Sequence, residues 1–189
     1  MSSAFVEFEV HPGSIDGLLH LTMKQAADER GAVREVYRAS AFDVAGLPLG
    51  PWVQVNVTES KRGAVRGLHA EDMNKLVAVV AGAAFGVYLD MRPESPTHGG
   101  VETAELVPGV QVFVPRGVAN GFQAVAPGVT QYLYVFDKEW QPGMGGRACS
   151  PLDPGLGIQW PLAIDDEDRA QISLKDRDAP MFAPRSDDR

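Results

Sequence analysis

Apolar and polar residues alternate along most of the chain in short runs, a pattern typical of β-strands with one buried face. These runs are rich in Val, Tyr and Phe and span residues 6–10, 34–38, 52–57, 75–80, 85–91, 110–114 and 130–136. Segments rich in Gly and Pro, which favour turns, lie between them at residues 46–51, 92–100, 108–110, 115–117 and 126–129. Only two segments favour a helix, residues 21–29 and 164–173. The pattern predicts an all-β fold, either an antiparallel sandwich, a jelly roll or a barrel.

The alternation also indicates which side chains share a face of a strand. In residues 52–57, Trp52, Gln54 and Asn56 point to one side and three valines to the other. In residues 130–136, the side chains that share a face are Thr130, Tyr132, Tyr134 and Phe136. If these polar and aromatic side chains face the inside of a barrel, they line a cavity for a ligand. An outward-facing polar row is the alternative.

The composition narrows the range of partners. The 189 residues suit a single domain, residues 1–189, with residues 183–189 as a frayed tail. With 17 basic and 25 acidic residues, the net charge of −8 argues against a nucleic acid or an anionic membrane as partner. A small phosphorylated ligand is compatible with this net charge. The start "MSSAFVEFEV" does not have the pattern of a signal peptide, and the chain contains no apolar run of membrane-spanning length. We therefore expect a cytoplasmic protein.

Two half-motifs narrow the fold. Five residues separate Gly63 from His69, and Gly109 is followed after five residues by "PRG" and, two residues later, by Asn120. The spacing resembles the paired motifs of the cupin jelly roll, whose histidines bind one metal ion. Here Asn120 replaces a motif histidine, and Cys149 is the single cysteine. Since transition-metal sites need three or four N, O or S donors, we predict that the protein binds no metal.

The segment "RGLH" poses a geometric problem. Arg66 and His69 are three residues apart, so a regular strand would place their side chains on opposite faces. Gly67 lies between them and permits a bulge that turns one side chain round.

Three specific motifs, "RGLH", "R-x-x-SPT-x-G" and "S-x-KD-x-x-x-P", occur in this order along the chain. Through these motifs the chain resembles the dTDP-4-dehydrorhamnose 3,5-epimerases, metal-free cupins of sugar-nucleotide metabolism, over residues 25–182. Further matches are "DERG", "VQVN", "KLV", "VPRGVANGF", "YLY" and "DPGLGIQWP". The resemblance implies a cupin-type double-stranded β-helix with a few short helices near the termini. It also implies an isomerase that needs no cofactor.

The resemblance implies roles for five side chains. His69 corresponds to the base, and imidazole is the side chain best suited to take up a proton near neutral pH. Asp176 corresponds to the carboxylate that orients it. Lys75 corresponds to the cation next to the keto oxygen, and Tyr134 to the proton donor on the opposite face, with Tyr132 as its rival. Arg66 corresponds to a diphosphate contact, for which a guanidinium is well shaped.

Other positions correspond to substrate-binding residues. Gln54, Asn56, Arg30 and Glu35 match positions that hold the nucleotide in relatives, although Arg30 and Glu35 could equally form a surface pair. Asn120 stands where most relatives have a histidine; it can hydrogen-bond a sugar hydroxyl but cannot take up a proton.

The expected substrate is a dTDP-4-keto-6-deoxyhexose. Its C3 and C5 protons are α to the ketone, so a base, an acid and a cation near O4 can invert both centres. A mono-epimerase acting at C3 or C5 for a secondary metabolite is the alternative. A non-catalytic sugar-nucleotide-binding cupin is less favoured, and a metal-dependent cupin oxygenase least of all. The resemblance also implies a homodimer, in which N-terminal residues cross to the partner.

Overall fold

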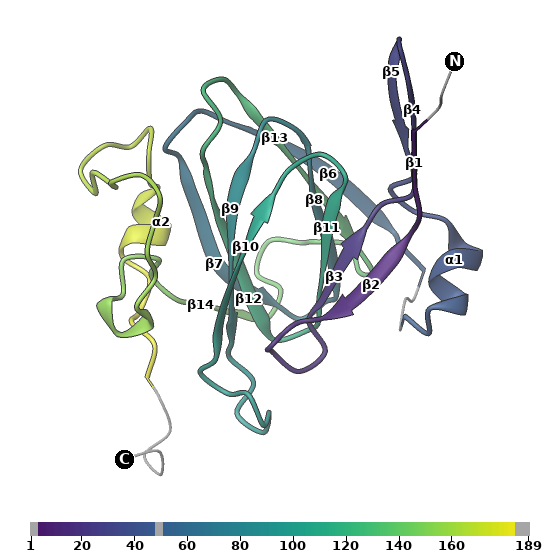
Figure 1. Ribbon diagram of the computed structural model, residues 1–189. Helices are drawn as coiled ribbons and strands as arrows, with labels where there is room; N and C mark the ends of the chain where they lie inside the picture. The colour runs from purple at the N-terminus through teal and green to yellow at the C-terminus, as the bar shows by residue number, and fades with distance from the viewer. Residues whose placement is uncertain (1–3, 48–50, 184–189) are drawn as a thin grey trace.

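The computed structural model describes residues 4–47 and 51–183, and within them two antiparallel sheets form a barrel (Figure 1). One sheet has the strand order β10 (Val101–Leu106), β9 (Ala84–Asp90), β12 (Val118–Ala124), β7 (Val65–Glu71) and β14 (Gly146–Ala148). The other has the order β2 (Glu9–Pro12), β3 (Leu19–Thr22), β11 (Val110–Val114), β8 (Lys75–Ala81), β13 (Thr130–Phe136) and β6 (Gln54–Ser60). The prediction of an all-β fold is confirmed.

A third sheet stands apart from the barrel. It consists of β1 (Ala4–Val6), β4 (Gln25–Asp28) and β5 (Gly31–Arg34). Figure 1 shows these strands projecting from one end of the molecule as an arm. The arm exposes large apolar side chains, including Phe5 and Val33.

The space between the two barrel sheets is filled by apolar side chains. Val77 and Val79 of β8 pack there with Val118 and Phe122 of β12 and with Tyr132 of β13. Because side chains alternate along a strand, the residues between them point outward. The interior row of β8 therefore consists of every second residue, and Lys75 continues it at the start of the strand.

Both outer faces are covered as well. On the six-stranded sheet, Leu76 and Ala78 pack under Phe42, which comes from the helix α1 (Ala39–Val44). On the five-stranded sheet, the C-terminal segment packs Trp160 and Phe182 against a cluster that includes Leu89. Strands β8 and β9 are therefore buried on both sides, which explains why their sequences are almost continuously apolar.

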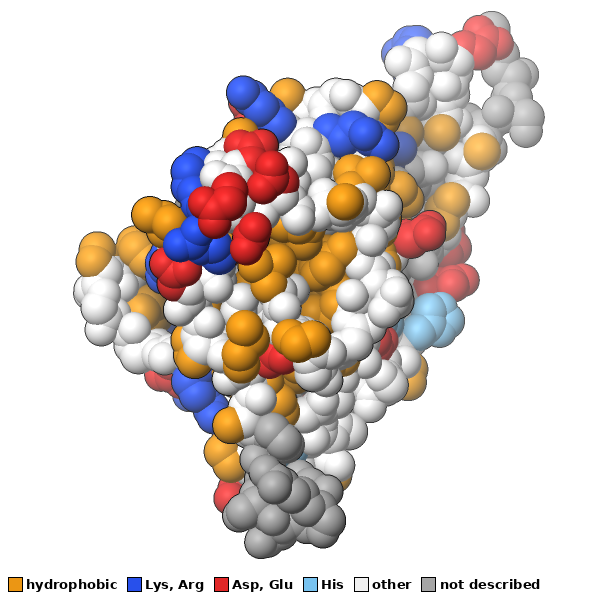
Figure 2. Space-filling view, turned by 90° about the vertical axis from the view of Figure 1, so that its left-hand side faces the viewer, with side chains coloured by type: hydrophobic (Ala, Val, Ile, Leu, Met, Phe, Trp, Pro, Cys, Tyr) orange, Lys and Arg blue, Asp and Glu red, His pale blue; other side chains and the backbone are white. Residues whose placement is uncertain are grey.

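Figure 2 looks onto the face that carries the C-terminal segment, where acidic and basic side chains gather next to each other above an apolar area. Several of these charges pair within the segment. Arg177 contacts Glu167 and Asp178, and Arg169 lies 3.9 Å from Glu167.

Most strand predictions agree with the structure. The predicted runs at residues 110–114 and 130–136 match β11 and β13, and those at 75–80 and 85–91 agree with β8 and β9 to within a residue. The runs at residues 6–10 and 34–38 are wrong. The first covers the end of β1 and the start of β2, which belong to different sheets, and in the second β5 ends at Arg34 before the chain turns into α1. Residues 48–50 of one predicted turn, and 184–189 of the predicted frayed tail, lie outside the described residues.

Both helix predictions are wrong. Residues 21–29 contribute to β3 and β4 instead, since pairing with β2, β11, β1 and β5 outweighs the helical propensity of the segment. Residues 164–173 form turns in which Asp165 and Asp168 accept hydrogen bonds from nearby backbone N–H groups. The helix α2 (Leu174–Arg177) begins only after Ser173, whose hydroxyl accepts a bond from the backbone N–H of Asp176. A short 3₁₀ helix, η1, covers Pro154–Leu156.

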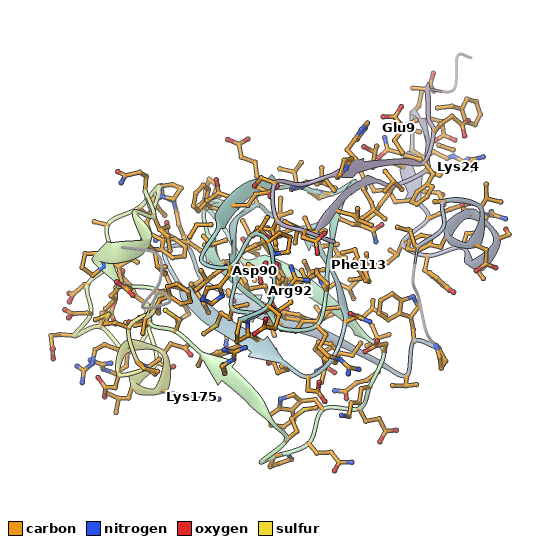
Figure 3. The ribbon with its side chains drawn as sticks, turned by 90° about the horizontal axis from the view of Figure 1, so that it is seen from below. Glu9, Lys24, Asp90, Arg92, Phe113 and Lys175 are labelled. Carbon is orange, nitrogen blue, oxygen red and sulfur yellow. The ribbon has the colours of Figure 1, made fainter. Side chains whose placement is uncertain are left out.

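The "SPT" motif forms a polar turn after β9. The buried carboxylate of Asp90 accepts hydrogen bonds from the Arg92 guanidinium and from the hydroxyls of Ser95 and Thr97, at 2.5–2.8 Å. Figure 3, which views the molecule from below, shows Asp90 and Arg92 side by side. Burial alone would raise the pKa of Asp90, but these bonds hold it well below its usual range.

Candidate active site

A bulge in β7 brings the two ends of "RGLH" to the same cavity. In the pairing of β7 with β12, His69 lies opposite Asn120 and Arg66 opposite Phe122, so β7 carries one extra residue. Gly67 in the bulge has φ +110°, and a Cβ there would lie 2.6 Å from the Cα of Gly121. The predicted bulge is confirmed: only a glycine fits this position.

The cavity lies at one end of the barrel interior and has a volume of about 170 Å³. Strands β6, β7, β8, β12 and β13 all contribute to it, as does the loop before β14. Its lining consists of Asn56, Thr58, Arg66, Gly67, His69, Glu71, Lys75, Asn120, Tyr134, Phe136 and Trp140. A neighbouring cavity, lined by the C-terminal segment, shares Thr58, Arg66, His69 and Tyr134 with it.

His69 is held by a carboxylate from the other end of the chain. Its Nε2 lies 2.7 Å from Oδ1 of Asp176, in the first turn of α2. Burial would raise the pKa of Asp176, but the bond from His69 keeps it below its usual range, so the carboxylate is ionised. Because a carboxylate only accepts hydrogen bonds, Nε2 donates this bond, and in the neutral imidazole Nδ1 then keeps its lone pair. The arrangement gives His69 a free basic nitrogen.

Lys75 is buried at the inner end of the cavity, with 2% of its surface exposed. Its Nζ donates to the Asn120 side-chain oxygen at 2.6 Å, to the His69 backbone carbonyl at 3.0 Å and to the Glu71 carboxylate. Burial lowers the pKa of Lys75, and the carboxylate of Glu71 opposes that shift. The site therefore places the amino group of Lys75 next to His69, in contact with one carboxylate.

Tyr134, rather than Tyr132, reaches the cavity. Tyr132 is fully buried and stacks on Phe122 with ring centroids 4.0 Å apart. Tyr134 lines both cavities together with His69. Burial raises the pKa of Tyr134, so its hydroxyl stays protonated at neutral pH and can donate a proton.

Two predicted binding residues, Arg66 and Asn56, line the same cavity, and a third, Gln54, contacts Asn56 beside it. Arg66 lines the cavity and donates to the Ser60 hydroxyl and the Glu59 carbonyl, and its guanidinium has no carboxylate partner among the described residues. Asn56 lines the cavity and accepts a bond from Gln54, whose own oxygen accepts from the backbone N–H of Trp140.

The other two predicted nucleotide residues lie elsewhere. Arg30 is in the turn of the arm between β4 and β5, where it pairs with Asp28 at 2.6 Å. Glu35 follows β5 and pairs with Arg38. Neither lines the cavity of its own chain.

The sequence analysis missed several residues of the lining. Glu71 could have been found, because it lies two residues after His69 and so shares its face of β7. Phe136 was placed on the same strand face as Tyr134 by the same rule, but it was not named as a site residue. Trp140 comes from a loop, and no pattern in the sequence places it at the site.

Within residues 4–47 and 51–183, no group of three or more His, Cys, Asp or Glu side chains is arranged to hold a metal ion. In the same part of the chain, no helix is long and apolar enough to cross a membrane.

The fold and the cavity together define a class: a cupin-type barrel with the groups of an acid–base enzyme. The family model described as dTDP-4-dehydrorhamnose 3,5-epimerase matches residues 12–184. The chain belongs to this family, whose members are isomerases.

Individual relatives agree with the family. A dTDP-4-dehydrorhamnose 3-epimerase from Streptomyces niveus is 34% identical over 185 residues, covering 94% of this chain and 86% of the relative. A 4-keto-6-deoxy sugar epimerase from the novobiocin cluster of Streptomyces spheroides superimposes with a TM-score of 0.84 at 31% identity, covering 96% of this chain and 90% of the other. The 3,5-epimerase of Legionella pneumophila, solved with dTDP-4-keto-L-rhamnose, gives 0.82 at 31% identity, covering 93% of each chain. The predicted cupin fold is confirmed.

Proposed function

We propose that this protein epimerises a dTDP-4-keto-6-deoxyhexose at C3 and C5, giving dTDP-4-dehydro-L-rhamnose or a related sugar. The observation that carries the proposal is the arrangement of His69, Lys75 and Tyr134 around one cavity, with Asp176 behind the imidazole. Family membership and the substrates named for the relatives support it.

The first step is removal of a proton. Nδ1 of His69 takes H⁺ from the carbon α to the ketone, and the C–H bonding pair becomes the C=C bond of an enolate. The C=O π pair moves onto O4. Asp176 stabilises the imidazolium that forms, as a carboxylate paired with histidine does in other enzymes.

The second step returns a proton to the opposite face. The hydroxyl of Tyr134 gives H⁺ to the carbon, the enolate collapses to the ketone, and the configuration is inverted. Solvent then reprotonates the tyrosinate and removes the proton from His69, so no atom is gained or lost. The ammonium of Lys75 stabilises the negative charge on O4, an effect that is large in a cavity shielded from water.

The nucleotide end of the substrate lies at the mouth. We assign the diphosphate to Arg66, whose guanidinium has no carboxylate partner among the described residues. Gln54 and Asn56 on the edge strand β6, next to Trp140, are the proposed contacts of the nucleoside.

A mono-epimerase is the second candidate, and one observation favours it. Asn120, which replaces a histidine of most relatives, binds Lys75 directly and cannot take up a proton. The Streptomyces niveus relative is named as a 3-epimerase. Under this alternative, His69 and Tyr134 act at C3 or C5 alone.

We propose that two copies of this chain form a homodimer. Val55 and Val57 on β6, the edge strand of its sheet, and Val53 just before it are exposed in a row, and such rows are commonly covered by a partner. We further propose that Arg30 on the arm, and Glu35 just after it, contact the cavity of the partner subunit, which would reconcile their position with the predicted nucleotide contacts.

Because the three apolar clusters share the same two sheets, we propose that the chain is one domain. We place it in the cytoplasm, where nucleoside diphosphates are found.

The test is a turnover assay with dTDP-4-keto-6-deoxyglucose, in which a 4-ketoreductase traps the product for NMR. The proposal predicts a product inverted at C3 and C5. Inversion at one carbon would select the second candidate, and recovery of the substrate with both centres unchanged would contradict the two alike.

A further inference from the structure

Glu71 brings a second carboxylate into the candidate site. It follows His69 by two residues on β7, so both side chains point into the same cavity. Its carboxylate contacts the Nζ of Lys75, the first residue of β8, which is the next strand along the chain. Asp176 supports the base on one side of the site, whereas Glu71 supports the cation.

Lys75 has few means of staying charged. It is the first residue of the interior row of β8, and the next members of that row are Val77 and Val79 in the apolar core. An isolated ammonium in such surroundings loses its proton unless it is paired, because burial disfavours the charged form. Of its three acceptors, Asn120 and the His69 carbonyl are neutral, and only Glu71 bears a charge.

We propose that Glu71 is a positioning residue that keeps Lys75 protonated inside the barrel and holds its ammonium at the inner wall of the cavity. This inference deepens the proposed function and rests on it, since Lys75 stabilises the enolate only while it is charged. The contact also uses one of the three N–H groups of Lys75, with the other two taken by Asn120 and the His69 carbonyl. A direct bond from Lys75 to O4 therefore requires one of these acceptors to give way.

The surroundings agree with this role. Burial would raise the pKa of Glu71, yet the ammonium of Lys75 holds it below its usual range, so the pair is ionic. The other titratable or charged groups facing the pair are His69 and Arg66 from β7 and Tyr134 from β13, with Asp176 from α2 behind His69. None of these is a second carboxylate in contact with Lys75 among the described residues.

The first test follows the titration of Lys75 without any substrate. The chain has five lysines, so protein labelled with ¹³C at lysine Cε gives few signals, and the one absent from Lys75→Arg belongs to Lys75. We expect this signal to titrate at lower pH in Glu71→Gln than in the wild type. In Glu71→Asp, which keeps the charge on a shorter side chain, the midpoint should lie between the two.

The control is Asp72→Asn, which removes the neighbouring carboxylate. Asp72 is half-exposed and pairs with Arg116 and Lys138 outside the cavity. The Lys75 signal should titrate in Asp72→Asn as in the wild type. Equal midpoints in all four proteins, or an equal shift in Asp72→Asn, would overturn the proposal. Should Glu71→Gln not fold, Glu71→Asp against Asp72→Asn makes the same comparison.

The second test is the pH profile of kcat. Since Lys75 acts when protonated, the alkaline limb of the kcat profile should move to lower pH in Glu71→Gln. In Glu71→Asp it should return part of the way, in step with the NMR midpoints. If the Lys75 midpoint moves in Glu71→Gln but the wild type shows no turnover, the role of Glu71 stands and the proposed function is refuted. If the wild type turns over substrate and the Lys75 midpoint does not move in Glu71→Gln, the proposed function stands and the role of Glu71 is refuted.

Discussion

Nε2 of His69 lies 2.7 Å from Oδ1 of Asp176, although the two residues are 107 positions apart in the sequence. Strand β7 supplies the imidazole, and the first turn of α2 supplies the carboxylate. Ser173 caps that helix and so fixes the position of Asp176. This contact explains why the "S-x-KD" motif lies at the far end of the chain, since the C-terminal segment folds back over the sheet that carries His69.

Asp176→Asn should slow the reaction strongly and leave nucleotide binding intact. An amide can donate to Nε2, which would move the imidazole proton to Nδ1 and block the base. We expect kcat to fall on the order of 10²–10⁴-fold, the range seen when acid–base groups or their orienting carboxylates are removed. Turnover and calorimetric binding of dTDP should be measured together. Wild-type kcat in this variant would contradict the role of Asp176.

Gly67→Ala should disrupt the bulge. The new Cβ would lie 2.6 Å from the Cα of Gly121, at a φ of +110° that an alanine rarely adopts. We expect a loss of unfolding free energy above ~1–3 kcal/mol, the cost of a strained backbone alone. Gly143→Ala is the control, because Gly143 has φ +79° and nothing within 4 Å of its Cβ position. Similar urea midpoints for the two variants would show that the close approach to Gly121 is unimportant.

Asp90 should make the stability depend on acid pH. Because its folded pKa lies below the usual value, its contribution is present above about pH 4 and is lost as the pH falls through the folded pKa. Asp90→Asn leaves Arg92 without its buried partner and should cost about 3–5 kcal/mol at pH 7. The loss of stability from pH 5 to pH 3 should then be shallower than in the wild type.

Urea unfolding at several pH values checks this, with Asp43→Asn, which changes an exposed carboxylate on α1, as the control. The predicted role of Asp90 is contradicted if Asp90→Asn and the wild type lose the same unfolding free energy between pH 5 and pH 3.

Val55→Asp should separate the proposed dimer. Val55 is 61% exposed at the centre of the valine row on β6, and a buried carboxylate in an apolar interface has no partner to offset its desolvation. Light scattering should give the mass of two chains for the wild type and of one for the variant. Val107→Asp, at an exposed valine between β10 and β11, should stay dimeric. A monomeric wild type would refute the dimer.

The sequence predicted those parts of the fold in which local pattern and tertiary environment agree. The period-two run at residues 130–136 is β13 because its alternate side chains face two buried layers. Residues 21–29 were predicted to be helical but contribute to strands, because they pair with strands that are distant in sequence, such as β11. The helix prediction for residues 164–173 was wrong for the opposite reason. The carboxylates of Asp165 and Asp168 accept hydrogen bonds from nearby backbone N–H groups, which form turns.

The candidate site likewise has residues that the sequence predicted and contacts that it did not predict. His69, Lys75, Tyr134 and Asp176 were named from motifs, and the bulge at Gly67 was predicted from strand geometry. The pairing of Lys75 with Glu71 was not, although only four residues separate them, since the turn between β7 and β8 has to form before this contact exists. Arg30 and Glu35 were named as nucleotide contacts, but the arm places them away from the cavity of their own chain.

The most direct test of the central claim is deuterium incorporation by wild type and His69→Asn. Each protein is incubated with dTDP-4-keto-6-deoxyglucose in D₂O, and the C3 and C5 protons are followed by NMR. The account predicts label at C3 and C5 in the wild type and at neither carbon in His69→Asn, which should still bind dTDP. Label in His69→Asn at the wild-type rate, or none in the wild type, would contradict proton abstraction by His69.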